Sequence, residues 1–422
     1  MGLRTAIFLF AAAIALNGCE RSGSRISGPI PQRGYLWQRE WTLAVIDALN
    51  VGQTHLSGVI LLAAEIDWRG TKAEVVRPQI DWKKIRSSGK PCSIALRVAP
   101  FSGQNREADA RIQFMLEATR SLLEEAHAAD VPITEFELDF DCAQEDLANY
   151  AKWIRFVQSI VHPTRFVITA LPAWLNQSAF SHLVREADGY VLQVHSVPTK
   201  NGESMVLCDP RLARDWVERA ARLHVPFSVA LPTYRCSAGY DPNGKLLSVA
   251  MDSVQPAWPP GTHILEFSAD ADEMATLVKQ WKQSRPVELR ELIWYRVPVA
   301  TDIRNWQWKT LSAVMSGQKP LHRLEVSHEG KNLCDIAIAN TGEADEPLDA
   351  VVTANWEGAA FVAADALPGW SVEVEKNRAV FRRMPGRRPI LPPGASRKIG
   401  WIRYSQFTTV QLELARKVET DR

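Results

Sequence analysis

The chain has 422 residues, of which 46% are hydrophobic and 23% are charged, so it is long enough to form two domains with sizeable cores. Its 49 basic and 48 acidic side chains leave a formal net charge of +1. Such a balance creates no overall field that attracts nucleic acid, and we expect no nucleic-acid partner. The 15 Trp residues suit core packing, their commoner use, and stacking on the flat faces of sugars.

The first residues have the pattern of an export signal. Arg4 supplies a positive charge, and Ala6–Leu16 is an apolar stretch too short to span a bilayer as a helix. The sequence Leu-Asn-Gly-Cys that ends at Cys19 resembles the lipobox of bacterial lipoproteins. The resemblance implies cleavage before Cys19 and lipidation of its thiol; a plain secretory signal is the alternative.

Lipidation of Cys19 implies an exported protein anchored to the cell envelope and facing the periplasm from the outer or inner membrane. We therefore expect a signal peptide over residues 1–18. Residues 19–33 are rich in Ser, Gly, Pro and Arg and have no apolar period, which predicts a flexible tether. No later segment is apolar enough to cross a membrane, so we expect membrane contact through the lipid alone.

Five cysteines remain after Cys19, an odd number for an oxidising compartment. They are Cys92, Cys142, Cys208, Cys236 and Cys334. Cys208 and Cys236 each follow one of two adjacent strands expected in this sequence, Gly189–Ser196 and Phe227–Tyr234, and so lie in loops at the same end of the sheet. We expect these two to form a disulfide. Their spacing matches no zinc site.

Residues 34–318 alternate short apolar runs with amphipathic helical segments, which predicts a parallel sheet. The expected strands are Tyr35–Trp41, Leu56–Trp68, Ser93–Pro100, Thr134–Asp141, Phe166–Trp174, Gly189–Ser196, Phe227–Tyr234 and Leu289–Val297. Eight strand–helix units over roughly 280 residues are typical of an α/β fold of the (β/α)8 or TIM-barrel type. A doubly wound open sheet is the alternative, but no G-x-G-x-x-G turn follows an early strand, as its dinucleotide-binding form requires.

Two further regions have patterns of their own. The insertion Arg235–Thr262 carries the turn sequence Asp-Pro-Asn-Gly at residues 241–244, which predicts a hairpin beside a binding cleft. Residues 319–422 contain short alternating apolar runs and predict a small β-sandwich domain. Such a domain either braces the barrel, the commoner role, or binds glycans.

The fourth expected strand carries three acidic residues at alternate positions. Strand alternation places Glu137, Asp139 and Asp141 inside the barrel and the apolar residues between them on the helix side. Successive members of such a row are roughly 7 Å apart. Unless cations neutralise them, at least one should keep its proton near neutral pH, which is what a general acid requires.

Other strand ends bring polar and aromatic side chains to the same face of a barrel. They are Glu65, Asp67, Arg97, Trp174, Gln193, His195, Tyr234, Trp294 and Arg296. One alternative is a closed ion-pair network in which Arg97 and Arg296 neutralise the acidic row. Another is a metal-dependent hydrolase using Asp139, Asp141 and His195, but no H-x-H or H-E-x-x-H spacing is present, and we expect neither a metal nor another cofactor.

Three runs resemble an uncharacterised bacterial family grouped with TIM-barrel glycoside hydrolases, over most of residues 34–317. They are Phe136–Cys142, Ile168–Trp174 and Asp188–Ser196. A more distant likeness is to family 18 chitinases, whose fourth strand ends in D-x-D-x-E with the last Glu as the acid. This likeness implies that Asp141, one methylene shorter than Glu, occupies the acid position and that Glu137 and Asp139 occupy the inner positions.

Together these patterns predict a glycoside hydrolase or glycan-processing enzyme whose partner is a glycan or other envelope polysaccharide. Asp141 would protonate the leaving oxygen, and Asp139 would tune Asp141 or stabilise charge. Glu65 or Asp67 would be the second carboxylate. Substrate binding is expected from Trp174, Tyr234, His195, Gln193, Arg97, Trp294 and Arg296. The alternative is a non-catalytic glycan- or envelope-binding lipoprotein on the same barrel.

Overall fold

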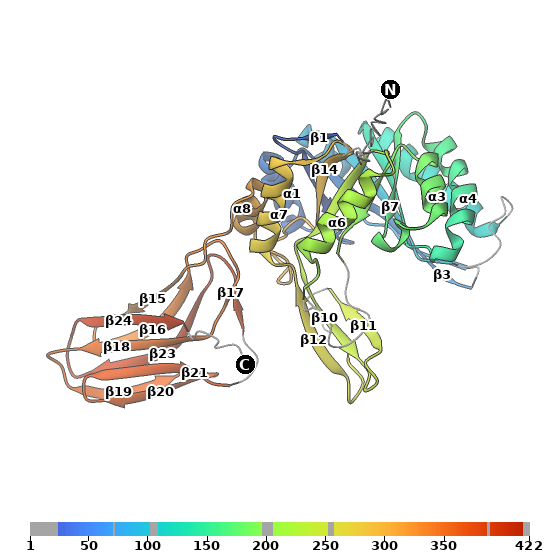
Figure 1. The fold of residues 1–422 in the computed structure, drawn as a ribbon. Helices are drawn as coiled ribbons and strands as arrows, with labels where there is room; N and C mark the ends of the chain where they lie inside the picture. Colours follow the sequence, from blue (N-terminus) through green and yellow to red (C-terminus); the bar gives the residue numbers. More distant parts are fainter. Residues whose placement is uncertain are drawn as a thin grey trace, which may run out of the picture.

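The computed structural model describes residues 24–70, 72–101, 109–195, 206–251, 257–385 and 389–416. It contains a barrel surrounded by helices and a separate β domain that follows it in the chain (Figure 1). The expected signal peptide and Cys19 lie outside the described residues. None of the helices in the described ranges has both the length and the apolar character needed to span a bilayer.

All eight predicted barrel strands are present, and their first and last residues differ slightly from the predicted ones. They are β2 (Gln32–Leu36), β3 (Gly58–Arg69), β5 (Cys92–Val98), β6 (Ile133–Phe140), β7 (Arg165–Ala170), β8 (Gly189–Gln193), β9 (Phe227–Pro232) and β14 (Leu289–Tyr295). Each strand pairs in parallel with the next. Because β14 also pairs in parallel with β2, the sheet is closed. The (β/α)8 prediction is confirmed, and the open-sheet alternative is wrong.

Helices lie around the strands, and several of them have an aspartate as N-cap. They are α1 (Leu43–His55), α2 (Trp82–Ser88), α3 (Ala110–Ala128), α4 (Leu147–Val161), α5 (Ser178–Leu183), α6 (Pro210–Ala221), α7 (Ala271–Gln283) and α8 (Trp308–Ser316). The carboxylates of Asp109, Asp209 and Asp270 accept hydrogen bonds from backbone N–H groups in the first turns of α3, α6 and α7. Short 3-10 turns occupy Gln144–Asp146, Pro172–Trp174 and Val184–Glu186.

The inside of the barrel is filled in layers. At the end where the strands begin, Arg33 donates hydrogen bonds to Glu135 and Ser93, each at 2.8 Å, and pairs with Glu291. The next layer is mainly apolar and consists of Tyr35, Ile60, Ala95, Val167, Val191, Ala230 and Ile293. These two layers close the barrel below its mouth, so a ligand can enter only at the carboxyl ends of the strands.

The segment that precedes β2 is fixed to the barrel. β1 (Arg25–Ile26) pairs with β13 (Arg285–Pro286), and the Arg285 guanidinium donates to the carbonyl oxygens of Gly28 and Pro29 at 2.9 and 3.0 Å. The expectation of a flexible tether up to Arg33 is therefore wrong for residues 24–33. Their backbone groups are held by hydrogen bonds that composition alone does not reveal.

Two additions extend the barrel at its carboxyl-end face. β4 (Lys72–Val76) pairs antiparallel with the end of β3 and was not predicted. The predicted hairpin is confirmed: β10 (Arg235–Tyr240) pairs with β11 (Leu246–Ala250) and also with β12 (His263–Ser268). This three-stranded sheet projects from the end of the barrel opposite to β1 (Figure 1).

The C-terminal region forms the predicted sandwich. One sheet contains β15 (Leu324–Glu329), β16 (Leu333–Asn340), β23 (Ser396–Tyr404) and β19 (Phe361–Ala366); the other contains β20 (Trp370–Glu375), β21 (Arg378–Arg383), β18 (Ala350–Trp356) and β24 (Val410–Arg416). The short β17 (Glu346–Pro347) pairs with β22 (Ile390–Leu391). Arg235 donates to Asp345 at 3.1 Å, so the hairpin sheet and the sandwich are in contact.

The predicted disulfide is wrong. Cys92, Cys142, Cys208, Cys236 and Cys334 are all buried free thiols. Cys208 packs in the core between the strands and the helices, whereas Cys236 packs in the apolar cluster of the hairpin sheet. The two side chains therefore point into different clusters, although both follow neighbouring strands.

The ion pairs of Arg33 generate a stability prediction. We expect Arg33→Leu to lower the free energy of unfolding by about 3 kcal/mol, because it leaves the Glu291 carboxylate in the barrel without its cation. Urea denaturation followed by tryptophan fluorescence measures this. The control is Arg155→Leu, which removes an exposed pair with Glu186 and should cost less than about 1 kcal/mol. Equal losses in the two variants would contradict a structural role for the Arg33 cluster.

Candidate active site

The acidic row of β6 points into the barrel as predicted. The alternate residues Phe136, Leu138 and Phe140 pack in the core between strands and helices. Glu137 is 0% exposed and Asp139 is 4% exposed, while Asp141, directly after the strand, is half-buried. Burial thus decreases along the row toward the mouth of the barrel.

A cavity of about 170 Å³ lies above this row; we call it the acid cavity. It is lined by Glu137, Asp139 and Asp141 together with Tyr35, Trp37, Arg97, Gln193, His195, Ala230, Tyr234, Met251 and Tyr295. The barrel therefore brings together the predicted residues Arg97, Gln193, His195 and Tyr234 with the acidic row.

Glu137 lies deepest. The Tyr35 hydroxyl donates a hydrogen bond of 2.7 Å to its Oε1, and its buried Oε2 has no hydrogen-bond partner. Burial raises the pKa of the Glu137 carboxyl to about 8, against the lowering effect of the bond from Tyr35. Glu137 is therefore mainly protonated at neutral pH.

Asp139 has the most partners of the row. Its Oδ1 accepts hydrogen bonds from Thr169 Oγ1 at 2.8 Å and from Gln193 Nε2 at 3.4 Å, and its Oδ2 lies 3.8 Å from the Arg97 guanidinium. Burial raises the Asp139 pKa, while Arg97 and the two hydrogen bonds oppose the rise. Sequence reasoning missed Thr169, although alternation along β7 would have placed it inside the barrel.

Asp141 is the least compensated carboxyl. Its Oδ1 is buried without a hydrogen-bond partner, and no ion pair is found for it within the described ranges. Burial raises the pKa of Asp141 to about 6; the nearby Asp139 adds to this rise and Arg97 opposes it. The group thus exchanges its proton in the mildly acidic range while facing a cavity.

Aromatic rings form one wall of the acid cavity. The His195 ring stacks on Tyr295, with centroids 5.6 Å apart and planes 21° apart, and the Tyr234 hydroxyl lies 3.5 Å from His195 Nδ1. Burial lowers the pKa of His195 to about 4, so at neutral pH the ring is an uncharged hydrogen-bonding group. Tyr295 was not predicted, because its neighbour Trp294 was assigned to the interior.

Trp174 and Trp294 do not line the cavity, and their predicted role in sugar binding is wrong. Trp294 is 0% exposed in the outer core, because the interior positions of β14 are those of Ile293 and Tyr295. Trp174 is 1% exposed; β7 ends at Ala170, and Trp174 lies in the following 3-10 turn, where its ring packs 5.8 Å from that of Phe180.

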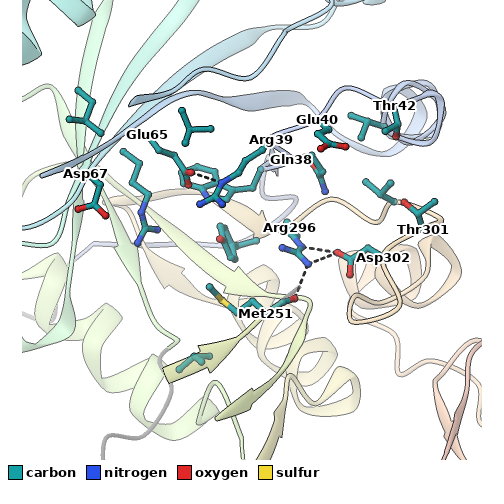
Figure 2. Close-up of a pocket in the computed structure, with 18 of the residues that line it drawn as sticks. Gln38, Arg39, Glu40, Thr42, Glu65, Asp67, Met251, Arg296, Thr301 and Asp302 are labelled. Atoms are coloured by element: carbon teal, nitrogen blue, oxygen red, sulfur yellow. Dashed lines mark hydrogen bonds and ion pairs between the residues drawn. The ribbon is translucent and has the colours of Figure 1, made fainter. Parts of the chain in front are cut away.

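A second cavity of about 840 Å³ shares Trp37, Arg97, Met251 and Tyr295 with the acid cavity. We call it the adjoining cavity, and the two together the trough. Figure 2 shows the side chains around the adjoining cavity. Its walls come from the segment after β2, from β3 to β5, from β11 and from the segment after β14.

The remaining predicted residues line the adjoining cavity. Glu65 accepts a hydrogen bond of 2.6 Å from Arg39 Nε, while Asp67 is exposed and accepts from the backbone N–H of Trp68. Arg296 is held by Asp302 at 2.8 Å and by the Met251 carbonyl at 3.2 Å (Figure 2). Arg97 pairs with Asp139, as the closed-network alternative expects. Arg296 pairs with Asp302 instead, and Asp141 has no ion pair among the described residues, so that alternative is wrong for Arg296.

The strand register connects the two cavities. Glu65 on β3 lies opposite Arg97 on β5, and Arg97 lies opposite Asp139 on β6. Arg97, with 43% of its side chain exposed, therefore stands between the two carboxylates. In the portion of the chain that the structure covers, no group of three His, Cys, Asp or Glu side chains is arranged to hold a metal ion.

The chain matches the model of a family described as "Domain of unknown function (DUF3142)" over residues 88–300, which confirms the predicted membership of a family without an established reaction. A second model, also described as a domain of unknown function (DUF8456), matches residues 323–405. No curated protein is found to be similar to this chain.

Solved structures with a similar fold include a bacterial spore cortex-lytic enzyme and bacterial chitinases. The spore cortex-lytic enzyme SleL of Bacillus megaterium has 12% identity and a TM-score of 0.48, with 70% of this chain and 75% of that chain covered. A chitinase of Chromobacterium violaceum has 14% identity and a TM-score of 0.44 over 68% and 98% of the two chains. A family 18 chitinase of the same species has 9% identity and a TM-score of 0.39 over 91% and 90%. At these values the likeness says nothing about activity, so the chemistry has to come from the residues themselves.

The deep position of Glu137 generates a pH prediction. Its pKa is about 8 in the folded protein and near 4.5 when exposed, so between these values the folded state binds more protons and stability falls as pH rises. Glu137→Gln cannot ionise and keeps an oxygen for Tyr35. We expect the variant to gain stability relative to the parent from pH 5 to pH 8, with a slope of up to about 1.4 kcal/mol per pH unit.

Urea denaturation at several pH values measures this difference. Glu145→Gln, which changes an exposed residue just beyond the row, is the control and should show no such trend. A Glu137→Gln difference that stays constant from pH 5 to pH 8 would contradict the elevated pKa.

Proposed function

The chain belongs to the family described as a domain of unknown function, DUF3142, and we propose that it is a glycoside hydrolase or related glycan-processing enzyme in which Asp141 is the general acid. The observation that carries this proposal is the state of Asp141. It is a half-buried carboxyl facing a cavity, with an unpartnered oxygen and a pKa of about 6. A general acid must hold a proton until the leaving oxygen takes it, and barrel enzymes place such groups at the carboxyl ends of their strands.

The neighbours of Asp141 support this role. Asp139 is held by Thr169 and Gln193, and its negative charge favours the protonated form of Asp141. Tyr234 and Tyr295 present aromatic rings to the cavity, and such rings pack against the apolar faces of sugars. The neutral His195 then orients sugar hydroxyl groups by hydrogen bonding.

Glu65 is the better candidate for the second carboxylate. Hydrolysis of a glycosidic bond commonly uses two carboxyl groups on either side of the bond. Glu65 lines the adjoining cavity directly across Arg97 from Asp139, whereas Asp67 lies farther along β3 and is exposed. We assign Asp67 to binding.

We further propose that Cys19 carries a lipid and that the protein faces the periplasm. Cys19 precedes Ser24 by only five residues, which span at most roughly 18 Å. Residues 24–29 are hydrogen-bonded to β13 and the end of α7, where the barrel strands begin. A lipid at Cys19 would thus keep that end near the membrane and direct the trough outward, toward envelope glycans.

Asp141→Asn tests the acid. We expect the full-length protein to release reducing ends from at least one envelope-type glycan in a library, faster at pH 5 than at pH 8 because Asp141 must be protonated. Asp141→Asn should lower kcat by about 100-fold or more. The matched control is Asp130→Asn, which changes an exposed residue in the loop before β6, at the opposite end of the same strand, and should leave the rate unchanged.

Two outcomes would count against the proposal. Undiminished hydrolysis by Asp141→Asn would remove this residue from the mechanism. Glycan binding by the parent without any hydrolysis would instead indicate a non-catalytic glycan-binding protein.

Cys19→Ala tests the anchor. We expect the parent to sediment with the membrane fraction and to incorporate labelled fatty acid, and the variant to do neither, because the thiol is the only attachment point proposed. Release of the parent into the soluble periplasmic fraction would contradict lipidation and favour a plain secretory signal.

A further inference from the structure

The adjoining cavity has an excess of acidic groups. Its carboxylates are Glu40, Glu65, Asp67, Glu74 and Asp302, and its guanidinium groups are Arg39, Arg97 and Arg296. Because the whole chain has a formal net charge of only +1, this excess is a local property of the cavity. A concave site lined mainly by one sign of charge concentrates ligands of the opposite sign.

Pairing leaves two of these carboxylates without a cation. Glu65 pairs with Arg39 at 2.6 Å, Asp302 with Arg296 at 2.6 Å and Glu74 with Arg69 at 2.7 Å. Glu40 and Asp67 have no ion pair among the residues that the structure describes. In Figure 2 they lie on opposite sides of the Arg39–Glu65 pair, so each can meet a different unit of an extended ligand.

Residues that line the trough also carry acceptor oxygens without hydrogen-bond partners, which add to its preference for positively charged ligands over negatively charged ones. Gln38 Oε1 in the adjoining cavity and Asp141 Oδ1 in the acid cavity are buried without a partner. Trp37 and Tyr295 line both cavities, and aromatic rings attract cations as well as sugars. The guanidinium groups that would attract an anion are already engaged with Glu65, Asp302 and Asp139.

From this combination we propose that the adjoining cavity selects glycans that carry primary ammonium groups, which pair with Glu40 and Asp67 while the scissile bond lies beside Asp141. The inference rests on the proposed function and names its substrate class. The ammonium belongs either to a hexosamine that lacks its N-acetyl group or to a peptide branch on an envelope glycan. Both sources present the same donor-rich cation.

Calorimetric binding to the full-length protein in detergent tests the proposal. We expect a glucosamine hexamer to bind at least about fivefold more tightly than an N-acetylglucosamine hexamer, and an oligogalacturonide to bind more weakly than either. The preference should shrink when salt rises from roughly 20 to 300 mM, because exposed charges are screened. An N-acetylated glycan with an amine-bearing peptide branch distinguishes the second source of the ammonium.

Glu40→Gln and Asp67→Asn should each lower affinity for the ammonium-bearing glycan about threefold, as expected for exposed ion pairs. The double variant should bring the preference close to unity. The matched control is Glu117→Gln with Glu124→Gln, which removes two exposed carboxylates from α3 and should leave the preference intact.

Equal or tighter binding of the neutral or anionic oligomers would overturn the inference, as would a preference that survives in the Glu40→Gln, Asp67→Asn double variant. Preferential binding of ammonium-bearing glycans without cleavage supports the inference and contradicts the hydrolase. Cleavage of neutral glycans with no preference for ammonium groups supports the hydrolase and contradicts the inference.

Discussion

The organisation of the site follows from the cost of removing the carboxylates of one strand from water. β6 and the residue that follows it direct four acidic side chains into the barrel, and these differ in how far hydrogen bonds and cations compensate them. Glu135 pairs with two guanidinium groups. Glu137 accepts a hydrogen bond from a tyrosine hydroxyl and has a raised pKa. Asp139 pairs with Arg97 and accepts two side-chain hydrogen bonds. Asp141 has neither an ion pair nor a partner for Oδ1 among the described residues. Since each unpaired buried charge is costly, Glu137 and Asp141, which have no ion pair among the described residues, have raised pKa values. Both line the acid cavity, and Asp141 is the less buried of the two.

The two ends of the barrel have different roles. The paired groups around Arg33 seal the end where the strands begin, and the apolar layer above them stiffens the barrel. Three acidic or amide side chains with an unpartnered buried oxygen, Gln38, Glu137 and Asp141, line the trough at the carboxyl-end face. Loops and the hairpin sheet supply its other walls.

The sequence predicts the barrel well because the hydrophobic period of each segment, and the order of the segments along the chain, can be read directly from it. Eight apolar runs alternate with helices, and a strict period of two fixed the inward direction of Glu137, Asp139 and Asp141. The predictions are wrong where a strand ends, or where the sequence does not decide which alternate residues face the interior. A shift of one residue exchanges the two faces of a strand. For this reason the prediction puts Trp294 in the interior in place of Tyr295. The prediction that Trp174 binds substrate is wrong because β7 ends at Ala170 and Trp174 lies in the turn that follows. The Cys208 and Cys236 pairing failed because a shared end of the sheet does not fix where a side chain points.

The most direct test of the account is the pKa of the Asp141 carboxyl in the free protein. Carbon-13 NMR of protein labelled at aspartate carboxyl carbons gives this value, with the Asp141 signal assigned from the spectrum of Asp141→Asn. The account predicts a titration near pH 6. A midpoint near 4, the value of an ordinary solvated aspartate, would contradict the claim that burial and the neighbouring carboxylate hold a proton at the mouth of the barrel.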